Sequence, residues 1–255
     1  MKRSLSAKNP FGVNRYGFLW ETLFLNNRGK HLDYGTYDGK VLSELSNSNV
    51  IKEGIGVDLN INAINSAKAI PENITLLPIR PIESKLPFED KSFDSISILD
   101  VIEHIHNQKS ILLELKRVLK PEGTLIITVP RKHYFSFLDL GNLKFVFPNL
   151  HKVFYQLIYS KEEYRKRYIE CDHGLFGDIE KEKSWHQHFS EKELSDLLRD
   201  TGFMAVEFDG TGLFTRPLLL FSILFPFARP LIQKIQEIDY RTFTSMNLFC
   251  VAKRQ

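Results

Sequence analysis

Residues 31–39, His-Leu-Asp-Tyr-Gly-Thr-Tyr-Asp-Gly, carry the residue types that most directly indicate chemistry. Asp33, Gly35 and Gly39 have the spacing D-x-G-x-x-x-G at the end of a short predicted strand. A glycine turn after a first strand lets a ligand approach the backbone closely. Asp58 ends the next predicted strand, where a carboxylate can accept hydrogen bonds from both hydroxyls of a ribose. The two features together predict a site for a cofactor that contains a nucleoside.

Alternating strands and helices must position these residues. Apolar patterning predicts strands at 31–34, 51–57, 74–77, 92–99, 124–129, 203–208 and 246–252. It predicts helices at 11–28, 39–47, 60–69 and 107–120, and one more that starts at the capping box Ser190–Glu193. Pro121-Glu122-Gly123 is expected to separate the fourth helix from the fifth strand. This alternation predicts an α/β fold with a mostly parallel seven-stranded sheet and helices on both faces.

The totals restrict the class of protein. The chain has 255 residues, of which 43% are hydrophobic and 25% charged, so it can bury a sizeable core. The net charge of +3 is too small to favour nucleic acid as a partner. Two cysteines, Cys171 and Cys250, form no disulfide framework and favour a reducing compartment. We expect neither a signal peptide nor a membrane-spanning helix, because no suitable apolar run occurs.

Two segments interrupt the alternation, and we predict a single domain that contains both as caps. The parts are an N-terminal capping helix (1–29), a cofactor-binding half (30–130), an insertion (131–184) and a C-terminal half (185–255) with an apolar insertion (211–240). Residues 131–168 contain ten aromatic residues and eight Lys or Arg against three acids. Such a segment suits a substrate lid or a contact with a lipid-linked or membrane-surface substrate. Nucleic acid binding is the less favoured alternative.

Four motifs in one order resemble a known family. They are Asp33 to Gly39; Gly54-Ile-Gly-Val-Asp58-Leu59; Leu86-Pro-Phe-Glu-Asp-Lys-Ser-Phe93-Asp94 followed by Asp100-Val-Ile-Glu103-His104; and Leu119-Lys-Pro121-Glu-Gly123-Thr-Leu125. In this respect the chain resembles class I S-adenosylmethionine-dependent methyltransferases, especially the methyltransferase type 11 group. The resemblance implies a Rossmann-like methyltransferase fold and S-adenosylmethionine as the cofactor.

The resemblance also assigns residues to the cofactor. It implies that Asp33, Tyr34, Gly35, Thr36, Tyr37 and Gly39 cradle the methionine end, that Asp58 binds the ribose, that Leu59 flanks the adenine and that Asp100 lies beside the methyl group. Two positions depart from the family pattern. Tyr37 replaces the middle glycine of the first motif, so its side chain must point away from the cofactor or close over it. Ile82 replaces an acid that contacts the adenine amine, and the neighbouring Glu83 is expected to substitute.

The acceptor and the catalytic base are less constrained by the sequence. We expect methyl transfer, with oxygen as the first choice of acceptor atom, to a small-molecule, glycan or lipid-linked acceptor. Four histidines are candidates for the base: His104, His173, His186 and His188. Cys171, Asp172 and these last three histidines would also suit zinc, but a polar loop is the favoured interpretation and no metal is expected.

The sequence offers two alternatives to methyl transfer. A non-catalytic binding module would follow if Tyr37 and Ile82 have abolished cofactor binding. A NAD-dependent oxidoreductase or epimerase is disfavoured, because the G-x-G-x-x-G turn is absent. We expect a cytoplasmic protein, with peripheral contact at the inner membrane face as an option. The sequence leaves the oligomeric state open.

Overall fold

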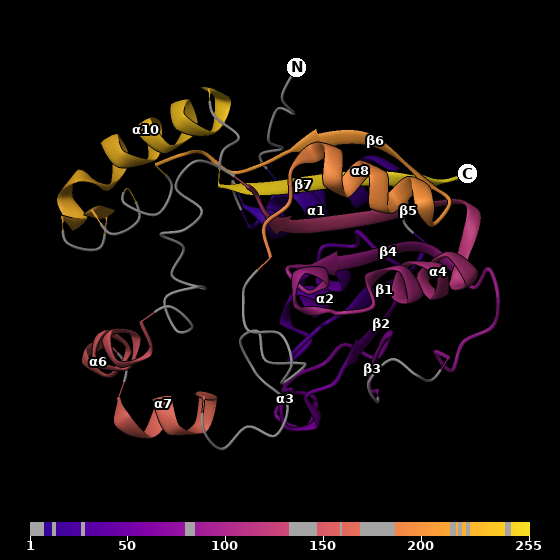
Figure 1. Ribbon diagram of the computed structural model, residues 1–255, viewed down its shortest axis with the longest axis horizontal. Coiled ribbons are helices and arrows are strands. Elements are labelled where there is room, and N and C mark those ends of the chain that lie inside the picture. Colours follow the sequence, from indigo (N-terminus) through magenta and orange to yellow (C-terminus); the bar gives the residue numbers. More distant parts are fainter. Residues whose placement is uncertain are drawn as a thin grey trace.

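One seven-stranded sheet forms the centre of the described structure, with the strand order β3-β2-β1-β4-β5-β7-β6 (Figure 1). The computed structural model describes residues 8–11, 14–26, 29–79, 85–132, 147–158, 160–168, 187–214, 218, 221–222, 225–242 and 246–255. The strands are β1 (Lys30–Tyr34), β2 (Glu53–Asp58), β3 (Ile74–Pro78), β4 (Phe93–Leu99), β5 (Leu119–Pro130), β6 (Phe203–Asp209) and β7 (Asn247–Arg254). Strands β1 to β5 are parallel, and β7 pairs antiparallel with β5 and β6. The predicted α/β class with a mostly parallel sheet is confirmed.

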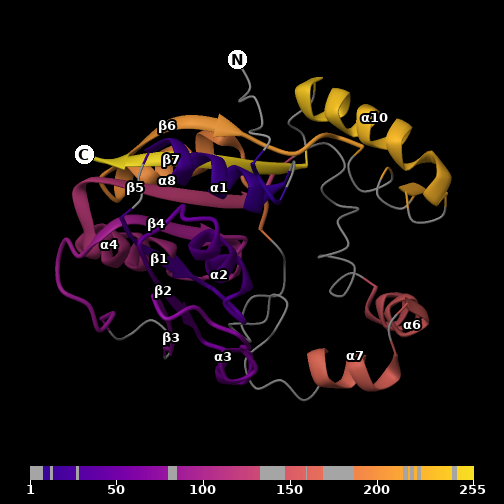
Figure 2. The same ribbon diagram turned by 180° about the vertical axis from the view of Figure 1, so that it is seen from behind.

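Helices cover both faces of this sheet. The described helices are α1 (Arg15–Asn26), α2 (Lys40–Asn47), α3 (Ile61–Asn65), η1 (Ile102–His104), α4 (Gln108–Val118), α6 (Pro148–Ile158), α7 (Lys161–Tyr168), α8 (Glu191–Asp200), η3 (Pro226–Ala228) and α10 (Arg229–Thr242). Apolar residues of α4 and α8 join one buried cluster with the sheet, and those of α1 and α2 join a second. Accordingly, α4 and α8 lie in front of the sheet in Figure 1, whereas α1 and α2 lie in front in Figure 2.

The carboxyl ends of three neighbouring strands meet at one edge of the sheet. In the register, Tyr34 of β1 lies opposite Val57 of β2 and Ile98 of β4. The turn that starts at Gly35 therefore lies beside the ends of β2 and β4. The strand order reverses between β1 and β4, which is the place where open α/β sheets bind ligands.

Several predicted boundaries are wrong: the helix predicted from residue 11 begins at Arg15, and the last strand, predicted to end at 252, ends at Arg254. Three further differences have a local cause. The β2 ladder begins at Glu53 instead of 51, because its partner β1 begins at Lys30. The third helix ends at Asn65 instead of 69. It cannot extend to Ala69, because the φ of that residue is 53°, outside the range of a right-handed α-helix. Helix α4 passes directly into β5, because Leu119 is already extended and pairs with Phe93. Pro121 to Gly123 therefore lie within β5 and are not the helix stop that we predicted.

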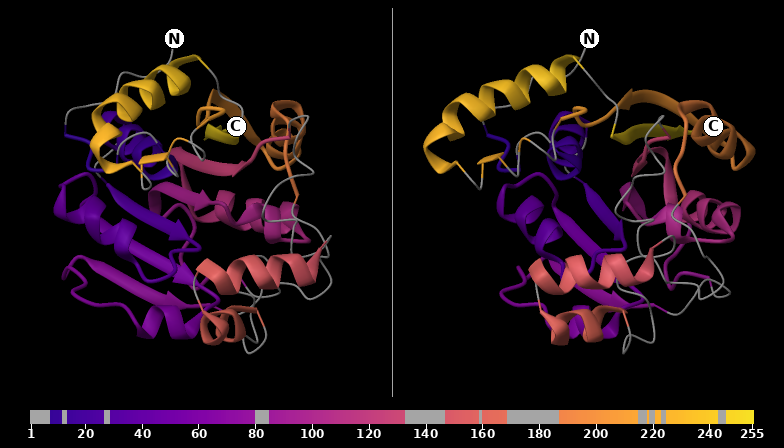
Figure 3. Two further views of the ribbon diagram at one scale, coloured as in Figure 1. Left: turned by 90° about the vertical axis from the view of Figure 1, so that its left-hand side faces the viewer. Right: turned by 60° about the vertical axis from the view of Figure 1, so that its left-hand side comes forward.

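Helices α6, α7 and α10 lie beyond the carboxyl ends of the parallel strands (Figure 3). The chain leaves the sheet after β5 and returns at Phe189. There the Phe189 N–H donates to the Pro130 carbonyl (2.9 Å) and the Lys132 N–H donates to the Phe189 carbonyl (2.8 Å). Much of the predicted insertion 131–184, namely 133–146, 159 and 169–184, lies outside the described residues. Within the described part of the chain, no helix has the length and apolar character needed to cross a bilayer.

Candidate functional site

The turn after β1 is held by its backbone against the end of β2. The N–H groups of Gly35 and Thr36 both donate to the Val57 carbonyl, at 2.8 and 3.1 Å. Gly35 and Gly39 have φ values of 88° and 71°, in the region that favours glycine. A Cβ atom at Gly35 would lie 2.4 Å from Cγ2 of Val101, so this position also has no room for a side chain. The two glycines are therefore required by the backbone path.

Tyr37 keeps the conformation that the missing glycine would have. Its φ is 55°, and its backbone N–H donates to Oδ2 of Asp58 at 2.7 Å. Left-handed backbone costs a non-glycine residue about 1–2 kcal/mol. The Tyr37 side chain is about half exposed, with 49% of its surface accessible. The substitution therefore preserves the shape of the turn and places an aromatic ring at its surface.

Asp58 closes this turn and keeps free acceptor capacity. One carboxylate oxygen accepts the Tyr37 N–H, and the other accepts the Asn60 N–H at 2.8 Å. Each oxygen of a carboxylate has about two lone-pair sites, so each oxygen retains one for a further donor. Burial raises the pKa of Asp58, although the backbone hydrogen bonds from Asn60 and Tyr37 oppose the shift. The carboxylate at the end of β2 is thus held by backbone donors on both sides of the turn.

A file of buried polar groups leads to Asp33 along the sheet. The Ser97 hydroxyl donates to Oδ1 of Asp33 at 2.5 Å, and the His31 ring contacts Ser95 Oγ through Nδ1 (2.8 Å) and Ser97 Oγ through Nε2 (2.9 Å). Because Ser97 gives its proton to Asp33, it accepts from Nε2–H of His31, and Nδ1 accepts from Ser95. Burial lowers the pKa of His31 to about 3, so the ring is neutral.

Leu32 alternates with these groups and packs on the opposite face of the sheet, so the polar file lies on the α1 and α2 side. Burial raises the pKa of Asp33, against the hydrogen bond from Ser97. The carboxylate at the start of the turn is therefore held by a fixed chain of side chains. Tyr34, by contrast, is buried with its side chain in the apolar cluster, where burial and the Asp58 carboxylate raise the pKa of its hydroxyl.

Asp100, at the end of β4, binds a residue that the sequence analysis missed. Its φ is 52°, its Oδ1 accepts the Thr128 hydroxyl at 2.6 Å, and its Oδ2 forms an ion pair with Arg15 of α1. The Arg15 guanidinium also donates to the Tyr16 hydroxyl at 2.9 Å and lies 4.8 Å from that ring centre. Burial lowers the pKa of Arg15, but Asp100 and Tyr16 outweigh it and the pKa is raised.

Helix α1 thus contributes a cation and a phenol to the end of β4. The sequence analysis predicted a capping helix for this part of the chain. Two aromatic residues of the helix have different surroundings: Trp20 is buried and stacks on Phe24 at 4.7 Å, whereas Tyr16 accepts a hydrogen bond from Arg15 of the Arg15–Asp100 pair. In the sequence, its position beside Tyr16 is the one feature that could have marked Arg15 as a residue of the site.

The candidate bases are described in part. His104 is half-buried in η1, directly after β4, and its Nε2 lies 3.8 Å from Oε1 of the buried Glu103. The Gln108 side chain donates to the Ile102 carbonyl (2.9 Å) and to Gln187 (2.8 Å). This bridge brings the residue next to His188 to the segment that contains His104. His173, His186, Ile82 and Glu83 lie outside the described residues.

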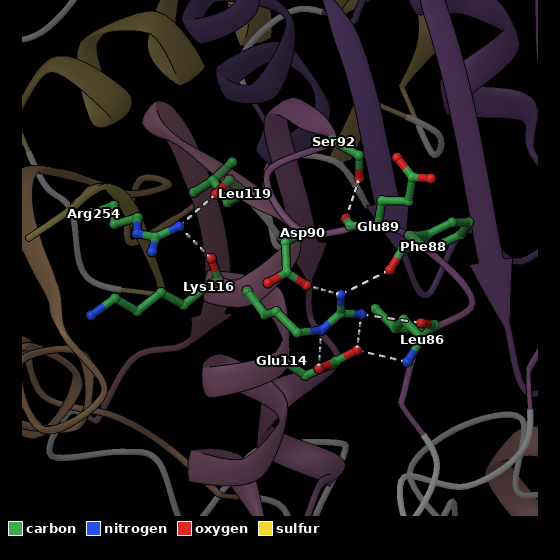
Figure 4. A network of polar contacts seen from close by, with 10 residues as sticks. Leu86, Phe88, Glu89, Asp90, Ser92, Glu114, Lys116, Leu119 and Arg254 are labelled. Atoms are coloured by element: carbon green, nitrogen blue, oxygen red, sulfur yellow. Dashed lines mark hydrogen bonds and ion pairs between the residues drawn. The ribbon is translucent and has the colours of Figure 1, made fainter.

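A second missed residue, Arg117, fixes the loop before β4 (Figure 4). Its guanidinium donates to the carbonyls of Phe88 (2.8 Å) and Leu86 (3.1 Å) and to the carboxylates of Glu114 and Asp90. Glu114 also accepts the Leu86 N–H at 2.6 Å, so α4 and the loop hold each other. The loop that contains the Leu-Pro-Phe motif is therefore anchored on α4 by Arg117, which lies 31 residues after Leu86 and 27 residues after Asp90.

Comparisons with known proteins agree with this geometry. Residues 13–207 match the family described as methyltransferase domain. The chain is 30% identical over 189 residues to an uncharacterised protein of Methanocaldococcus jannaschii, covering 73% of this chain and 66% of that protein. It is 34% identical over 118 residues to a demethylmenaquinone methyltransferase of Staphylococcus aureus, covering 44% of this chain and 47% of that enzyme. The matches thus span less than two thirds of these relatives' own lengths.

A solved structure shares the fold. A S-adenosylmethionine-dependent methyltransferase from Aquifex aeolicus superposes with a TM-score of 0.54 at 17% identity, covering 94% of this chain and 89% of that one. The predicted Rossmann-like methyltransferase fold is confirmed by this likeness. The family match covers well over half of the sequence. The chain therefore belongs to the family of methyltransferase domains, and the predicted resemblance to class I S-adenosylmethionine-dependent methyltransferases is confirmed.

Proposed function

We propose that the protein transfers a methyl group from S-adenosylmethionine to a small-molecule, glycan or lipid-linked acceptor, most simply to an oxygen atom. One observation carries the proposal. In a chain of the methyltransferase family, the glycine turn, Asp58 and the Arg15–Asp100 pair lie at the carboxyl ends of neighbouring strands, at the point where the strand order reverses.

The chemistry of these groups fits the parts of this cofactor. Asp58 has one acceptor site left on each oxygen, which suits the two ribose hydroxyls. Arg15 and Asp100 carry opposite charges, which suits a ligand that has a carboxylate together with an ammonium and a sulfonium group. Leu59 would flank the adenine, and Glu83 would take the adenine amine. The turn from Asp33 to Gly39 would hold the methionine end.

S-adenosylmethionine, when bound, supplies an electrophilic methyl group. The residues around it must place an acceptor in line with that group and exclude water, which is where most of the rate acceleration would arise. A hydroxyl acceptor must also lose its proton as the new O–C bond forms. His104, His173, His186 and His188 are the proposed groups for this proton transfer. The Nε2 atom of His104 lies 3.8 Å from Oε1 of the buried Glu103, and this described carboxylate neighbour supports His104 as a candidate.

The remaining finer predictions concern location and partners. We infer from the cysteine usage that the protein works in the cytoplasm, and the aromatic and basic composition of 131–168 supports peripheral contact with the inner face of the membrane. The named activity of the Staphylococcus aureus relative is a methyl transfer to demethylmenaquinone. That activity supports a small organic acceptor here, without identifying it.

Calorimetric titration of the purified protein with S-adenosylmethionine, S-adenosylhomocysteine and NAD tests the proposal. The expected result is micromolar binding of both sulfur nucleosides and no binding of NAD. Binding of NAD alone would replace the proposal with an oxidoreductase or epimerase. Absence of binding to all three would show that Tyr37 and Ile82 have abolished the site, and the fold would then serve as a binding module.

A further inference from the structure

Six large apolar side chains are exposed along η3, α10 and the residues just before η3, where Phe221 is helical. They form what we call the outer face of α10: Phe221, Phe225, Phe227, Leu231, Ile235 and Ile238, with exposed fractions of 53, 42, 85, 62, 41 and 63%. The Phe225 ring lies 6.0 Å from both the Phe221 and the Phe227 rings, so the three aromatic residues form one surface. Contiguous apolar surface of this kind marks an interaction site.

The helix is anchored by a different side. Leu231, Ile235 and Ile238 fall within an arc of about 60° at 3.6 residues per turn, and the buried Ile232 and Asp239 lie roughly a quarter-turn away. The Asp239 carboxylate accepts the Phe214 N–H at 2.9 Å, which ties α10 to the chain after β6. The buried Ile232 and Asp239 therefore anchor the helix, and its outer face stays exposed.

A second exposed apolar stripe lies on α6. Phe147, Leu150, Val153 and Leu157 have exposed fractions of 58, 46, 56 and 76%. Helices α6 and α10 both lie beyond the carboxyl ends of the parallel strands, at the end of the sheet that carries Asp58 and Asp100 (Figure 3). Both stripes therefore belong to helices at the end of the sheet that carries the candidate site.

Cations accompany both stripes. Arg229 and Lys234 are exposed on α10 beside one exposed acid, Glu237. Lys161 and Arg165 are exposed on α7, which follows α6 directly, again beside one exposed acid, Glu162. The segment 131–168 as a whole has eight Lys or Arg against three acids. Phenylalanine and leucine beside lysine and arginine is the composition that binds the interface of anionic bilayers, where each basic side chain near the surface contributes attraction.

We propose that the outer face of α10, together with the stripe on α6, docks the protein on an anionic membrane surface with its site directed at that surface. Charge favours the bilayer over a second copy of the chain, because the described exposed cations of α7 and α10 outnumber the exposed acids and two copies would bring surfaces of like net charge together. The inference deepens the proposed function by naming a lipid phase as the source of the acceptor. The docking itself requires neither the cofactor nor methyl transfer.

Vesicle co-sedimentation tests the surface. The full chain is incubated with vesicles of phosphatidylcholine alone and of phosphatidylcholine with phosphatidylglycerol, at low and high salt. We expect binding to the anionic vesicles that weakens as salt rises. The double variant Phe227→Ser/Leu231→Ser should bind at least about tenfold more weakly, because two exposed apolar side chains no longer enter the interface. Lys234→Glu should reduce binding to anionic vesicles only.

The control is Leu113→Ser/Met204→Ser, which removes two other exposed apolar side chains (53 and 51%) from α4 and β6, away from the outer face of α10. It should bind vesicles like the parent chain. Titration with S-adenosylhomocysteine in the same preparations separates the two proposals, since the Phe227/Leu231 variant should keep parental affinity. The docking proposal is overturned if the parent does not sediment with anionic vesicles, or if both double variants bind equally. A dimer that the Phe227/Leu231 variant alone converts to monomer, without vesicle binding, would assign the face to a second copy.

Discussion

Replacement of Asp58 should weaken cofactor binding, and the number of hydrogen bonds that are lost gives the expected change in binding free energy. The carboxylate already accepts two backbone N–H groups and has one acceptor site left on each oxygen. Loss of hydrogen bonds to a charged acceptor costs about 1.5–3 kcal/mol. Asp58→Ala should therefore raise the dissociation constant for S-adenosylhomocysteine by about 2 kcal/mol, or roughly thirtyfold. Asp58→Asn keeps one acceptor oxygen without the charge, and its affinity should fall between those of the parent and the alanine variant.

The assay is calorimetric titration, accompanied by urea unfolding of each variant. Asp58→Ala also removes the acceptor of the Tyr37 N–H, so a loss of stability of about 1 kcal/mol is expected. Glu53→Ala is the charge-matched control, because Glu53 lies at the opposite end of the same strand with half of its side chain exposed. Its affinity should match that of the parent.

The pH dependence gives an independent check on Asp58. Burial raises its pKa above the ordinary aspartate value, and only the ionised carboxylate accepts from both hydroxyls. Binding should thus be complete above this raised pKa and fall as the pH is lowered through it. The fall should begin at a higher pH than an ordinary aspartate would give, and should be absent in Asp58→Asn. Parental affinity in a folded Asp58→Ala variant would refute the assignment of this residue to the ribose.

Three further predictions concern the scaffold around the site. The pKa of His31 is about 3 in the folded chain and 6.5 in the unfolded chain. Between these pH values the unfolded chain binds one more proton than the folded chain. The free energy of unfolding therefore falls as the pH drops below 6.5, by up to about 1.4 kcal/mol per pH unit. Urea unfolding at several pH values should show a shallower slope for His31→Gln, and parallel curves would contradict the neutral buried ring. Tyr37→Val should lower the free energy of unfolding by about 1 kcal/mol or more, because a β-branched residue disfavours the φ of 55°, whereas Tyr37→Gly should not; equal losses in both would refute the backbone argument. Arg117→Ala should cost about 1–3 kcal/mol in thermal or urea unfolding, because it releases the carbonyls of Leu86 and Phe88 together, and an unchanged midpoint would show that the loop is held otherwise.

The local motifs could be predicted because their physics is local. The glycines of the turn and the capping box at Ser190 and Glu193 each depend on residues within a few positions. The structure has all of these features. The alternation of strands and helices could be predicted as well, because apolar residues recur at different spacings in helices and in strands.

Long-range polar pairings could not be predicted in the same way. Arg15 and Asp100 are separated by 85 residues, and the Ser97 and Asp33 side chains by 64. Neither pair leaves a periodic signal, since a single arginine on a capping helix looks like any solvated residue. The start of β5 was missed for a similar reason. Proline and glycine normally mark a break, but at Pro121 and Gly123 the ladder with β4 had already begun at Leu119.

The short parallel bridge between Arg131 and Phe189 has a consequence for how acceptor preference can diversify in this lineage. Its hydrogen bonds bring the exit and the re-entry of the intervening chain side by side at the end of β5. Loops whose ends already meet change length at little entropic cost, since each doubling adds only about 0.6 kcal/mol. The segment between the two residues can therefore be lengthened, shortened or exchanged with little effect on the sheet. Because the sequence predicts that this segment covers the substrate, its exchange between relatives tests directly whether it selects the acceptor.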